Sequence, residues 1–265
     1  MNIYIYCFKP IYHYFEDYIK TINKKLNATI IYDLSENITL NENNIIICMQ
    51  KIPPLKNIIK KNIYLLNTEQ LTRTNWLNYI KSICNNFTII DYSKENIYIM
   101  KNNGITNTLY FPYIYNPDEI YNYNKIYNIC GIIMYNTPRR NNFMNDMKFK
   151  NIDIKNIIGW NEKRDNELFR YKIILNISVS EHYNIFETMR CYRCLFNKMI
   201  VISEEKYKQD LIDYSEHILF AKITDIPELI KKVLSNYEYY YNLLKIDNVN
   251  YNLNDNLIKP SLLII

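Results

Sequence analysis

The feature that most constrains the fold is an alternation of short Ile-rich runs with longer amphipathic stretches. Residues 2–7, 28–32 and 44–49 are short apolar runs of the kind that form buried strands. Between the first two, residues 12–26 place Tyr18, Ile19 and Ile22 at helical spacing. Strands and helices that alternate with short links form parallel sheets covered by helices, so the sequence predicts an α/β fold.

The same alternation continues to the end of the chain. In the first half, further strands are predicted at 62–66, 87–90 and 108–111, and helices at 68–84 and 94–101, the latter capped by Asp91 or Ser93. In the second half, strands are predicted at 128–134, 154–158, 172–177, 199–203 and 217–220. Helices are predicted at 138–148 (with Thr137 as its cap), 162–169, 185–197, 206–214 and 226–244.

A turn-rich connector separates two such series. Pro112 and Pro117 bracket it, and the alternation restarts after Asn122. We therefore predict two Rossmann-like domains, 1–122 and 123–265, facing a cleft, with one continuous doubly wound sheet as the alternative. In sheets of this kind ligands bind outside the carboxyl ends of the strands, where loops lead into helix N-termini.

Composition argues against several classes of function. The chain has 27 Tyr but 3 Gly, and it is rich in Asn, Ile and Lys. Since these residues have AT-rich codons, the bias indicates an AT-rich genome, such as that of a protist, a low-GC bacterium or a large DNA virus. The net charge of +5 comes from 32 basic and 27 acidic residues that are interleaved without long runs. We therefore predict no nucleic-acid partner.

Neither a metal site nor a secreted location is predicted. Most of the 6 cysteines lie in apolar runs, and the pair Cys191 and Cys194 has no second pair or His cluster that would complete a zinc site. The first residues do not resemble a signal peptide, and no apolar run reaches the length of a membrane span. These features predict a cytoplasmic protein without a bound metal or other cofactor.

Two predicted strand ends carry residues suited to a nucleotide. Thr137, Arg139 and Arg140 begin a helix directly after a strand, where backbone N–H groups and guanidinium groups favour a diphosphate. In the alternative interpretation, one arginine is solvated and the other pairs with a carboxylate of the protein. Gly159 and Trp160 follow the next strand, where Trp160 would either stack on a base or pack at the rim.

The most informative stretch is 180–190, a polar loop that leads from a strand into a helix. Tyr183, Asn184 and Phe186 lie in it, and Glu187 is predicted in the first helical turn, where it can accept hydrogen bonds from a ribose diol. The alternative is an ion pair between Glu187 and Arg190.

The segment SEHYNIFETMRCYRCLFNKMIVISEE resembles the donor-binding segment of GT-B glycosyltransferases, in which a helix glutamate holds the nucleotide ribose. GIIMYNTPRRNNFM and IIGWNEKRDNELFRYKIILNIS resemble the neighbouring donor-domain segments. YLLNTEQLTRTNWL and IIDYSKENIYIM with LYFPYIYNP resemble the acceptor domain of small glycosyltransferases of large DNA viruses.

This resemblance implies transfer of a sugar from a nucleotide-sugar donor to a glycan or protein acceptor. Many retaining members carry two glutamates separated by seven residues, whereas five residues separate Glu181 from Glu187, so stereochemistry stays open. His182, Glu181 and Glu69 are the candidates for acid–base catalysis. No D-x-D triplet occurs, and basic side chains and helix dipoles are expected to stabilise the leaving diphosphate without a metal. The alternative function is a nucleotide- or sugar-binding module that has lost catalysis.

Overall fold

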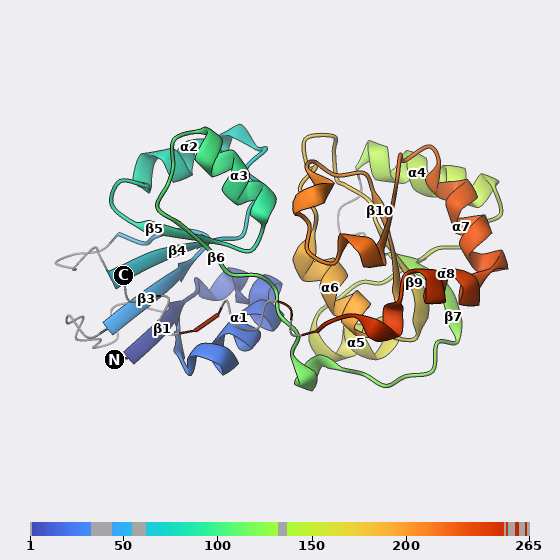
Figure 1. The fold of residues 1–265 in the computed structure, drawn as a ribbon, viewed down its shortest axis with the longest axis horizontal. Helices are drawn as coiled ribbons and strands as arrows, with labels where there is room; N and C mark the ends of the chain where they lie inside the picture. Colours follow the sequence, from blue (N-terminus) through green and yellow to red (C-terminus); the bar gives the residue numbers. More distant parts are fainter. Residues whose placement is uncertain are drawn as a thin grey trace. The chain divides into compact units, whose positions relative to one another are not determined.

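The computed structural model describes residues 2–32, 44–54, 62–131, 137–251, 253, 258–259 and 263. It divides into two compact units, each considered by itself. The first comprises Met1–Ile114 with Asn252–Ile265, and the second comprises Tyr115–Tyr251. Each unit contains one parallel β-sheet with helices packed against it (Figure 1).

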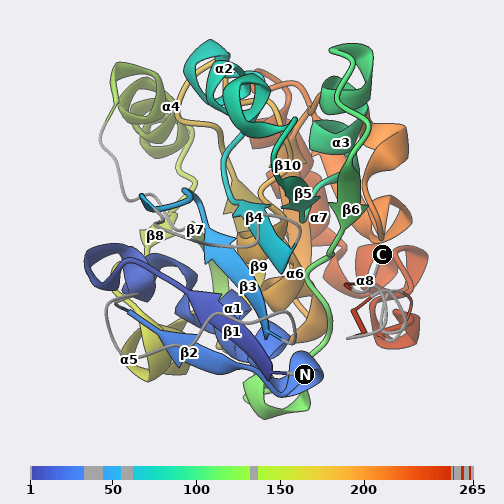
Figure 2. The same cartoon turned by 90° about the vertical axis from the view of Figure 1, so that its left-hand side faces the viewer.

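The first unit holds a six-stranded parallel sheet in the order β2-β1-β3-β4-β5-β6. Its strands are β1 (Asn2–Tyr6), β2 (Thr29–Ile31), β3 (Asn44–Met49), β4 (Ile63–Asn67), β5 (Thr88–Asp91) and β6 (Thr108–Tyr110). The helices are α1 (Tyr12–Leu26), α2 (Thr74–Ile83) and α3 (Lys94–Asn102). Figure 2 is viewed from the left-hand side of Figure 1, so that these strands face the reader.

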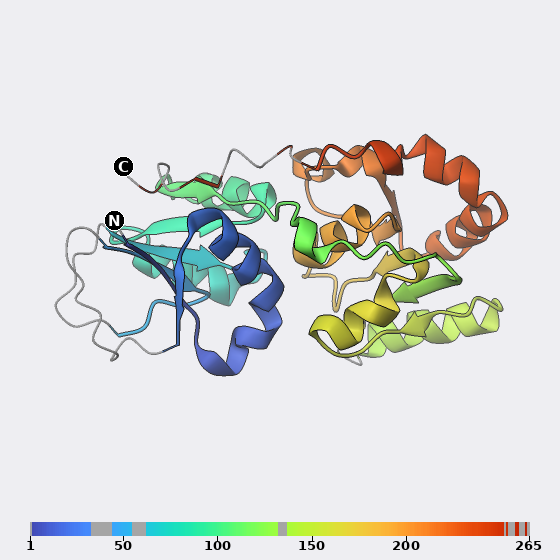
Figure 3. The ribbon, with the colours of Figure 1, turned by 90° about the horizontal axis from the view of Figure 1, so that it is seen from below.

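The strand order reverses direction at β1, and this explains where the helices lie. The β1–α1–β2 connection runs toward one edge of the sheet, and the later connections run toward the other. Because parallel crossovers are right-handed, connections in opposite directions place their helices on opposite faces. Figure 3 shows α1 on one face, with α2 and α3 behind the sheet. The switch point between β1 and β3 is where such sheets usually bind ligands.

The second unit holds a five-stranded parallel sheet in the order β11-β10-β9-β7-β8. Its strands are β7 (Tyr127–Gly131), β8 (Lys155–Asn156), β9 (Tyr171–Asn176), β10 (Ile200–Glu204) and β11 (Ile218–Ala221). Its helices are α4 (Pro138–Phe149), α5 (Asn161–Leu168), α6 (Thr188–Phe196), α7 (Ile226–Ser235) and α8 (Tyr237–Leu243). In Figure 1, α4 lies on one face of this sheet, and α5 and α6 lie on the other.

Local sequence explains the central strands and two helix starts. All residues of β3 and β4 are buried, as expected for strands with helices on both faces. Ser93 caps α3 by accepting a hydrogen bond from the Asn96 amide, and Thr137 caps α4 in the same way through the Arg140 amide. The Thr137 cap is confirmed, and of the two caps offered for α3, Asp91 and Ser93, the structure has Ser93.

Four predicted helices differ from the structure. The helix predicted at 185–197 begins only at Thr188, which leaves Glu187 before its first turn. The helix predicted at 68–84 begins only at Thr74, and the one predicted at 226–244 is divided at Asn236 into α7 and α8. Residues 206–214 form no α-helix and contain only a short 3₁₀ turn, Gln209–Leu211. Lys208 and Tyr214 have left-handed backbone conformations, with φ of +50° and +60°, which cannot continue a right-handed helix.

The unit boundaries also differ from the predicted domains 1–122 and 123–265. The second unit already begins at Tyr115, whose ring stacks on Tyr251 at 4.8 Å between centroids and meets Phe196 edge-on. The final residues belong to the first unit, where Tyr64 donates a 2.5 Å hydrogen bond to the Leu263 carbonyl. The predicted two-sheet α/β architecture is confirmed. The cleft between the domains stays a prediction.

Candidate functional site

The first turn of α4 is attached to the segment that follows β9. Thr137 Oγ1 and Arg139 Nη1 each donate to a carbonyl of residues 177–179, at 3.1 and 3.0 Å. Arg140 donates through both Nε and Nη2 to another carbonyl of this segment, at 3.1 and 2.6 Å. Two arginines at a helix N-terminus are thus fixed by the carboxyl end of the neighbouring strand.

Glu204, the last residue of β10, joins this arrangement. Arg139 binds its carboxylate with both terminal nitrogens, and the Ser178 amide donates to Oε2 at 3.1 Å. Both side chains of the ion pair retain some exposure, 21% for Arg139 and 14% for Glu204. The pairing of one arginine with a carboxylate of the protein was the alternative interpretation from the sequence.

Lys206 lies at the same edge and is the cation that the sequence analysis missed. It is 7% exposed, and its ammonium donates to Ser178 Oγ, which in turn donates to the Tyr183 carbonyl at 2.7 Å. Among the described residues no carboxylate forms an ion pair with Lys206. Its position just after the end of β10 was the available signal, because carboxyl ends of parallel strands share one edge.

Glu187 and Arg190 form the ion pair that the sequence offered as an alternative. Glu187 Oε2 lies 2.6 Å from Arg190 Nη1, and both side chains are 19% exposed. Glu187 is the N-cap of α6, so it lies just before the first turn. Its backbone carbonyl accepts from the Arg190 and Cys191 amides. Arg190 also approaches Asn176 Oδ1, at the end of β9, at 3.5 Å.

Positive charge exceeds negative charge at this edge. The cations are Arg139, Arg140, Arg190 and Lys206, and the carboxylates are Glu187 and Glu204. Burial is the main cause that lowers the pKa of Lys206 and that of Arg140, while Glu187 and Glu204 act to raise both and Arg190 acts to lower both. We call these six residues the cation cluster. Its excess positive charge suits a bound anion, as at phosphate sites.

The remaining predicted residues of the 180–190 loop are placed differently. Phe186 is fully buried against Tyr192 and Phe220, so it belongs to the core and does not line a surface. Glu181 and His182 are exposed in a turn beyond β9. Asn184 Oδ1 is buried and has no partner among the described residues.

Gly159 and Trp160 follow β8, at the far edge of the second sheet. Gly159 has φ of +115°, a conformation that L-residues rarely adopt, which explains a glycine here. Trp160 immediately precedes α5 and is partly buried. Its stacking on a base stays a prediction.

Glu69 lies in the first unit, just beyond β4. Gln50 Nε2 and Arg73 Nη1 donate to its two carboxylate oxygens, at 2.6 and 2.8 Å. Burial raises the pKa of Glu69, although the hydrogen bonds from Gln50 and Arg73 act to lower it. The Glu69 side chain is 20% exposed, so it combines partial desolvation with access from solvent.

A buried aspartate supports the loop that carries Glu69. Asp91 accepts from Asn67 Nδ2 at 2.7 Å, from the Ser93 amide at 2.8 Å and from Asn96 Nδ2 at 3.2 Å. Complete burial raises the pKa of Asp91 to about 7 despite these hydrogen bonds. Burial therefore shifts this enclosed carboxyl group toward its protonated form.

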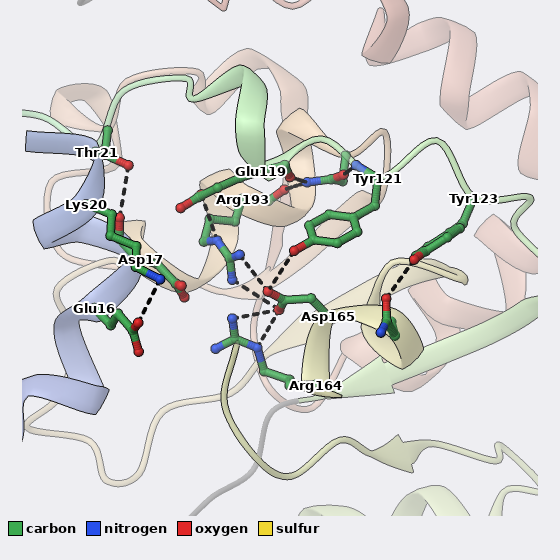
Figure 4. A network of polar contacts seen from close by, with 12 residues as sticks. Glu16, Asp17, Lys20, Thr21, Glu119, Tyr121, Tyr123, Arg164, Asp165 and Arg193 are labelled. Carbon is green, nitrogen blue, oxygen red and sulfur yellow. Dashed lines mark hydrogen bonds and ion pairs between the residues drawn. The ribbon is translucent and has the colours of Figure 1, made fainter. Parts of the chain in front are cut away.

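A third polar network, shown in Figure 4, pairs its charges within the second unit. Asp165 is 2% exposed and accepts from Arg193 and Arg164, with Arg193 Nη2 at 2.9 Å and Arg164 Nε at 2.7 Å. Arg193 also bonds Glu119 in the connector at 2.9 Å. Since the connector is held to α5 and α6 by this network, we interpret it as structural. The described residues contain no group of three or more potential metal ligands.

Comparison with solved structures gives the class of fold. A search of known family models found no match. A mutant of S. aureus TarM in complex with Fondaparinux, alpha-GlcNAc-glycerol and UDP is similar with a TM-score of 0.59 and 15% identity, over 87% of this chain and 57% of TarM. An alpha1,3-fucosyltransferase gives a TM-score of 0.56 and 13% identity, over 100% of this chain and 88% of that chain. The chain therefore has the fold of GT-B glycosyltransferases.

Sequence relatives define the family more narrowly. Uncharacterized protein L140 of Acanthamoeba polyphaga mimivirus is 30% identical over 86% of this chain and 78% of its own length. The chain belongs to the same family as L140. Protein L138 of the same virus is 31% identical over 88% of this chain, but the match spans only 29% of L138. The predicted resemblance to proteins of large DNA viruses is thereby confirmed. In the described ranges no helix is both long and apolar enough to cross a membrane.

Proposed function

We propose that the protein is a glycosyltransferase that transfers a sugar from a nucleotide-sugar donor to a glycan or protein acceptor. The observation that carries the proposal is the cation cluster at the carboxyl ends of β9 and β10. Four cations against two carboxylates leave an excess positive charge, and Lys206 and Arg140 are held there although burial is unfavourable for charge. A bound diphosphate would compensate this cost.

In this proposal different residues contact the diphosphate and the ribose of the donor. Lys206 and the arginines would neutralise the diphosphate, and they would stabilise the negative charge that develops on it as the glycosidic bond breaks. Glu187 uses Oε2 for Arg190, and its other oxygen would accept from the ribose. The cluster supplies positive charge from side chains, so we propose that the transfer needs no bound metal.

A thermal-shift screen with UDP, GDP and matching nucleotide-sugars tests the donor site. A ligand that binds only the native state at 100 times its Kd stabilises the protein by about 2.7 kcal/mol. We expect at least one nucleoside diphosphate to raise the melting temperature, and adenosine without phosphates to leave it unchanged. If no nucleotide raises it, the proposed donor site is wrong.

Release of the sugar separates an enzyme from a binding module. The nucleotide-sugar that binds is incubated with the protein without acceptor, and free sugar is measured over time. We expect slow hydrolysis that requires the protein. Binding without any release, also in the presence of candidate acceptors, would favour the inactive binding module over the glycosyltransferase.

A further inference from the structure

Ser178, just beyond the end of β9, contacts three members of the cation cluster. Its amide donates to Glu204 Oε2 at 3.1 Å, and its carbonyl accepts from Arg139 Nη1 at 3.0 Å. Its hydroxyl accepts from the Lys206 ammonium. The residue is 3% exposed, so these bonds form away from bulk water. One serine therefore bonds to an arginine, a glutamate and a lysine of the proposed donor site.

The hydroxyl proton of Ser178 fixes the direction of its bond with Lys206. A serine hydroxyl carries one proton, and here that proton is donated to the Tyr183 carbonyl at 2.7 Å. The lone pairs of the oxygen thus serve Lys206, whose ammonium can only donate. Across the described ranges the ammonium donates to no other group, so two of its three N–H groups stay available to a ligand.

Lys206 depends on this bond more than the arginines of the cluster depend on any one partner. Arg139 is bound by the carboxylate of Glu204, and Arg140 donates twice to a backbone carbonyl. Lys206 has no carboxylate partner in the described parts of the chain. Because a lysine side chain has many rotamers, confining it to one costs conformational entropy. The Ser178 hydroxyl therefore keeps a buried ammonium in one orientation before any ligand binds.

The bond to Tyr183 alone would have a purely structural explanation, because serine hydroxyls often bond to nearby backbone groups and shape turns. Ser203, at the end of β10, is such a case. It is fully buried, donates to the Glu204 carbonyl at 2.8 Å and accepts from Asn176 Nδ2 at 3.1 Å. Among the described residues no cation donates to its hydroxyl. The bond from Lys206 is what distinguishes Ser178 from this structural serine.

We propose that Ser178 is a positioning residue of the donor site, which holds the Lys206 ammonium so that its other two N–H groups are available to the diphosphate. This inference rests on the proposed function, to which it adds a residue that acts without touching the donor. Since Ser178 acts through Lys206, its contribution to nucleotide binding should disappear when Lys206 is replaced.

A double-mutant cycle measured by calorimetry with UDP and with GDP tests this dependence. We expect Ser178→Ala to weaken the binding of at least one of them about tenfold, the size expected for one charged hydrogen bond. In a Lys206→Met background the same substitution should change affinity by less than about twofold. The matched control is Ser203→Ala, which should lower the melting temperature but keep the affinity within about twofold of the wild type.

A second measurement needs no nucleotide. An acceptor hydroxyl favours the charged form of an ammonium, so NMR titration should show a lower pKa of Lys206 in Ser178→Ala than in Ser203→Ala. Ser178→Cys keeps the size of the side chain but offers a poor acceptor. It replaces Ser178→Ala in both measurements if that variant does not fold.

The outcomes separate this inference from the proposed function. If the wild type binds UDP or GDP, equal losses of affinity in the two backgrounds, no loss in Ser178→Ala, or an unchanged pKa of Lys206 would each overturn the inference and leave the donor site standing. If the wild type binds neither nucleotide, the donor site is refuted, and the assignment of Ser178 to it is refuted as well. A loss of affinity that requires Lys206, together with the lower pKa, supports both.

Discussion

The carboxyl edges of the two sheets have a similar architecture but bury different ionisable groups. In the second unit the edge buries cations, with Lys206 7% and Arg140 2% exposed. In the first unit the edge buries a carboxyl group, Asp91, and surrounds it with the neutral amides of Asn67 and Asn96. In both units the parallel sheet with reversed strand order brings several loops to one edge, and ligands of such folds bind there. The side chains on these loops then decide which ligand can bind.

The difference also predicts what relieves the cost of buried charge at each edge: a bound anion at the cation cluster and a proton at Asp91. A buried cation without a carboxylate partner destabilises the protein until an anion binds. A buried carboxyl group destabilises it once the group loses its proton. Variants that remove the charge of Lys206 or Asp91 therefore test whether the first of these residues binds an anion and the second is held in its protonated form.

The largest effect is expected from Lys206→Met, which keeps the length of the side chain but removes its charge. We expect UDP affinity to fall by roughly 10- to 100-fold, since a charged hydrogen bond is worth about 1.5–3 kcal/mol. The melting temperature should rise, because an apolar group replaces a charge whose pKa is lowered by burial. Calorimetry and thermal unfolding measure both, and Lys231→Met on the exposed face of α7 is the control. A loss of stability with unchanged UDP affinity would contradict the proposed role of the cation cluster in binding the diphosphate.

The second prediction concerns Asp91→Asn and the pH dependence of stability. The native pKa of Asp91 is raised to about 7 from 3.8, so the folded protein holds this proton more tightly than the unfolded chain. The stability it contributes is complete below about pH 4 and is lost as the pH rises through about 7. We expect the wild type to lose on the order of 2 kcal/mol, or roughly 5 °C in melting temperature, between pH 5 and 8 relative to the variant. Parallel pH profiles of the two proteins would refute this interpretation.

A smaller effect is expected from Glu187→Gln. The variant keeps the shape of the side chain but loses the charge that would bind the ribose, so UDP affinity should fall about tenfold. Stability should change by only tenths of a kcal/mol, because the Glu187–Arg190 pair is partly exposed and close in sequence. Glu69→Gln in the other unit is the matched control and should leave UDP affinity unaltered. A lower melting temperature with normal affinity would instead assign Glu187 a structural role.

Removal of metal ions is expected to have no effect on UDP affinity or sugar release. The cation cluster already supplies positive charge for the diphosphate, and the described residues offer no group of three metal ligands. UDP affinity and sugar release should therefore be the same with and without a chelator. Loss of sugar release that Mg²⁺ or Mn²⁺ restores would show that side-chain charge alone is insufficient.

The sequence by itself determined most of the secondary structure. Ile-rich runs marked the buried strands, since strands covered on both faces must be apolar along their whole length. Ser93 and Thr137 marked two helix starts, because an N-cap acts within one turn of the chain. The resemblance of the 180–205 segment to a donor-binding segment led to the GT-B fold, which the comparisons confirm.

Only the tertiary structure decided which side chains share an edge and what they bind. Lys206 was assigned to a helix from its local pattern, yet it lies buried against Ser178, which is far from it in sequence. The loop after β4 was also predicted as helix, but Asn67 and Asn96 hold it in another shape. Arg139 finds its carboxylate on Glu204, at the end of a strand much later in the chain. Such partners are brought together by the pairing of parallel strands, and local propensity carries no information about them.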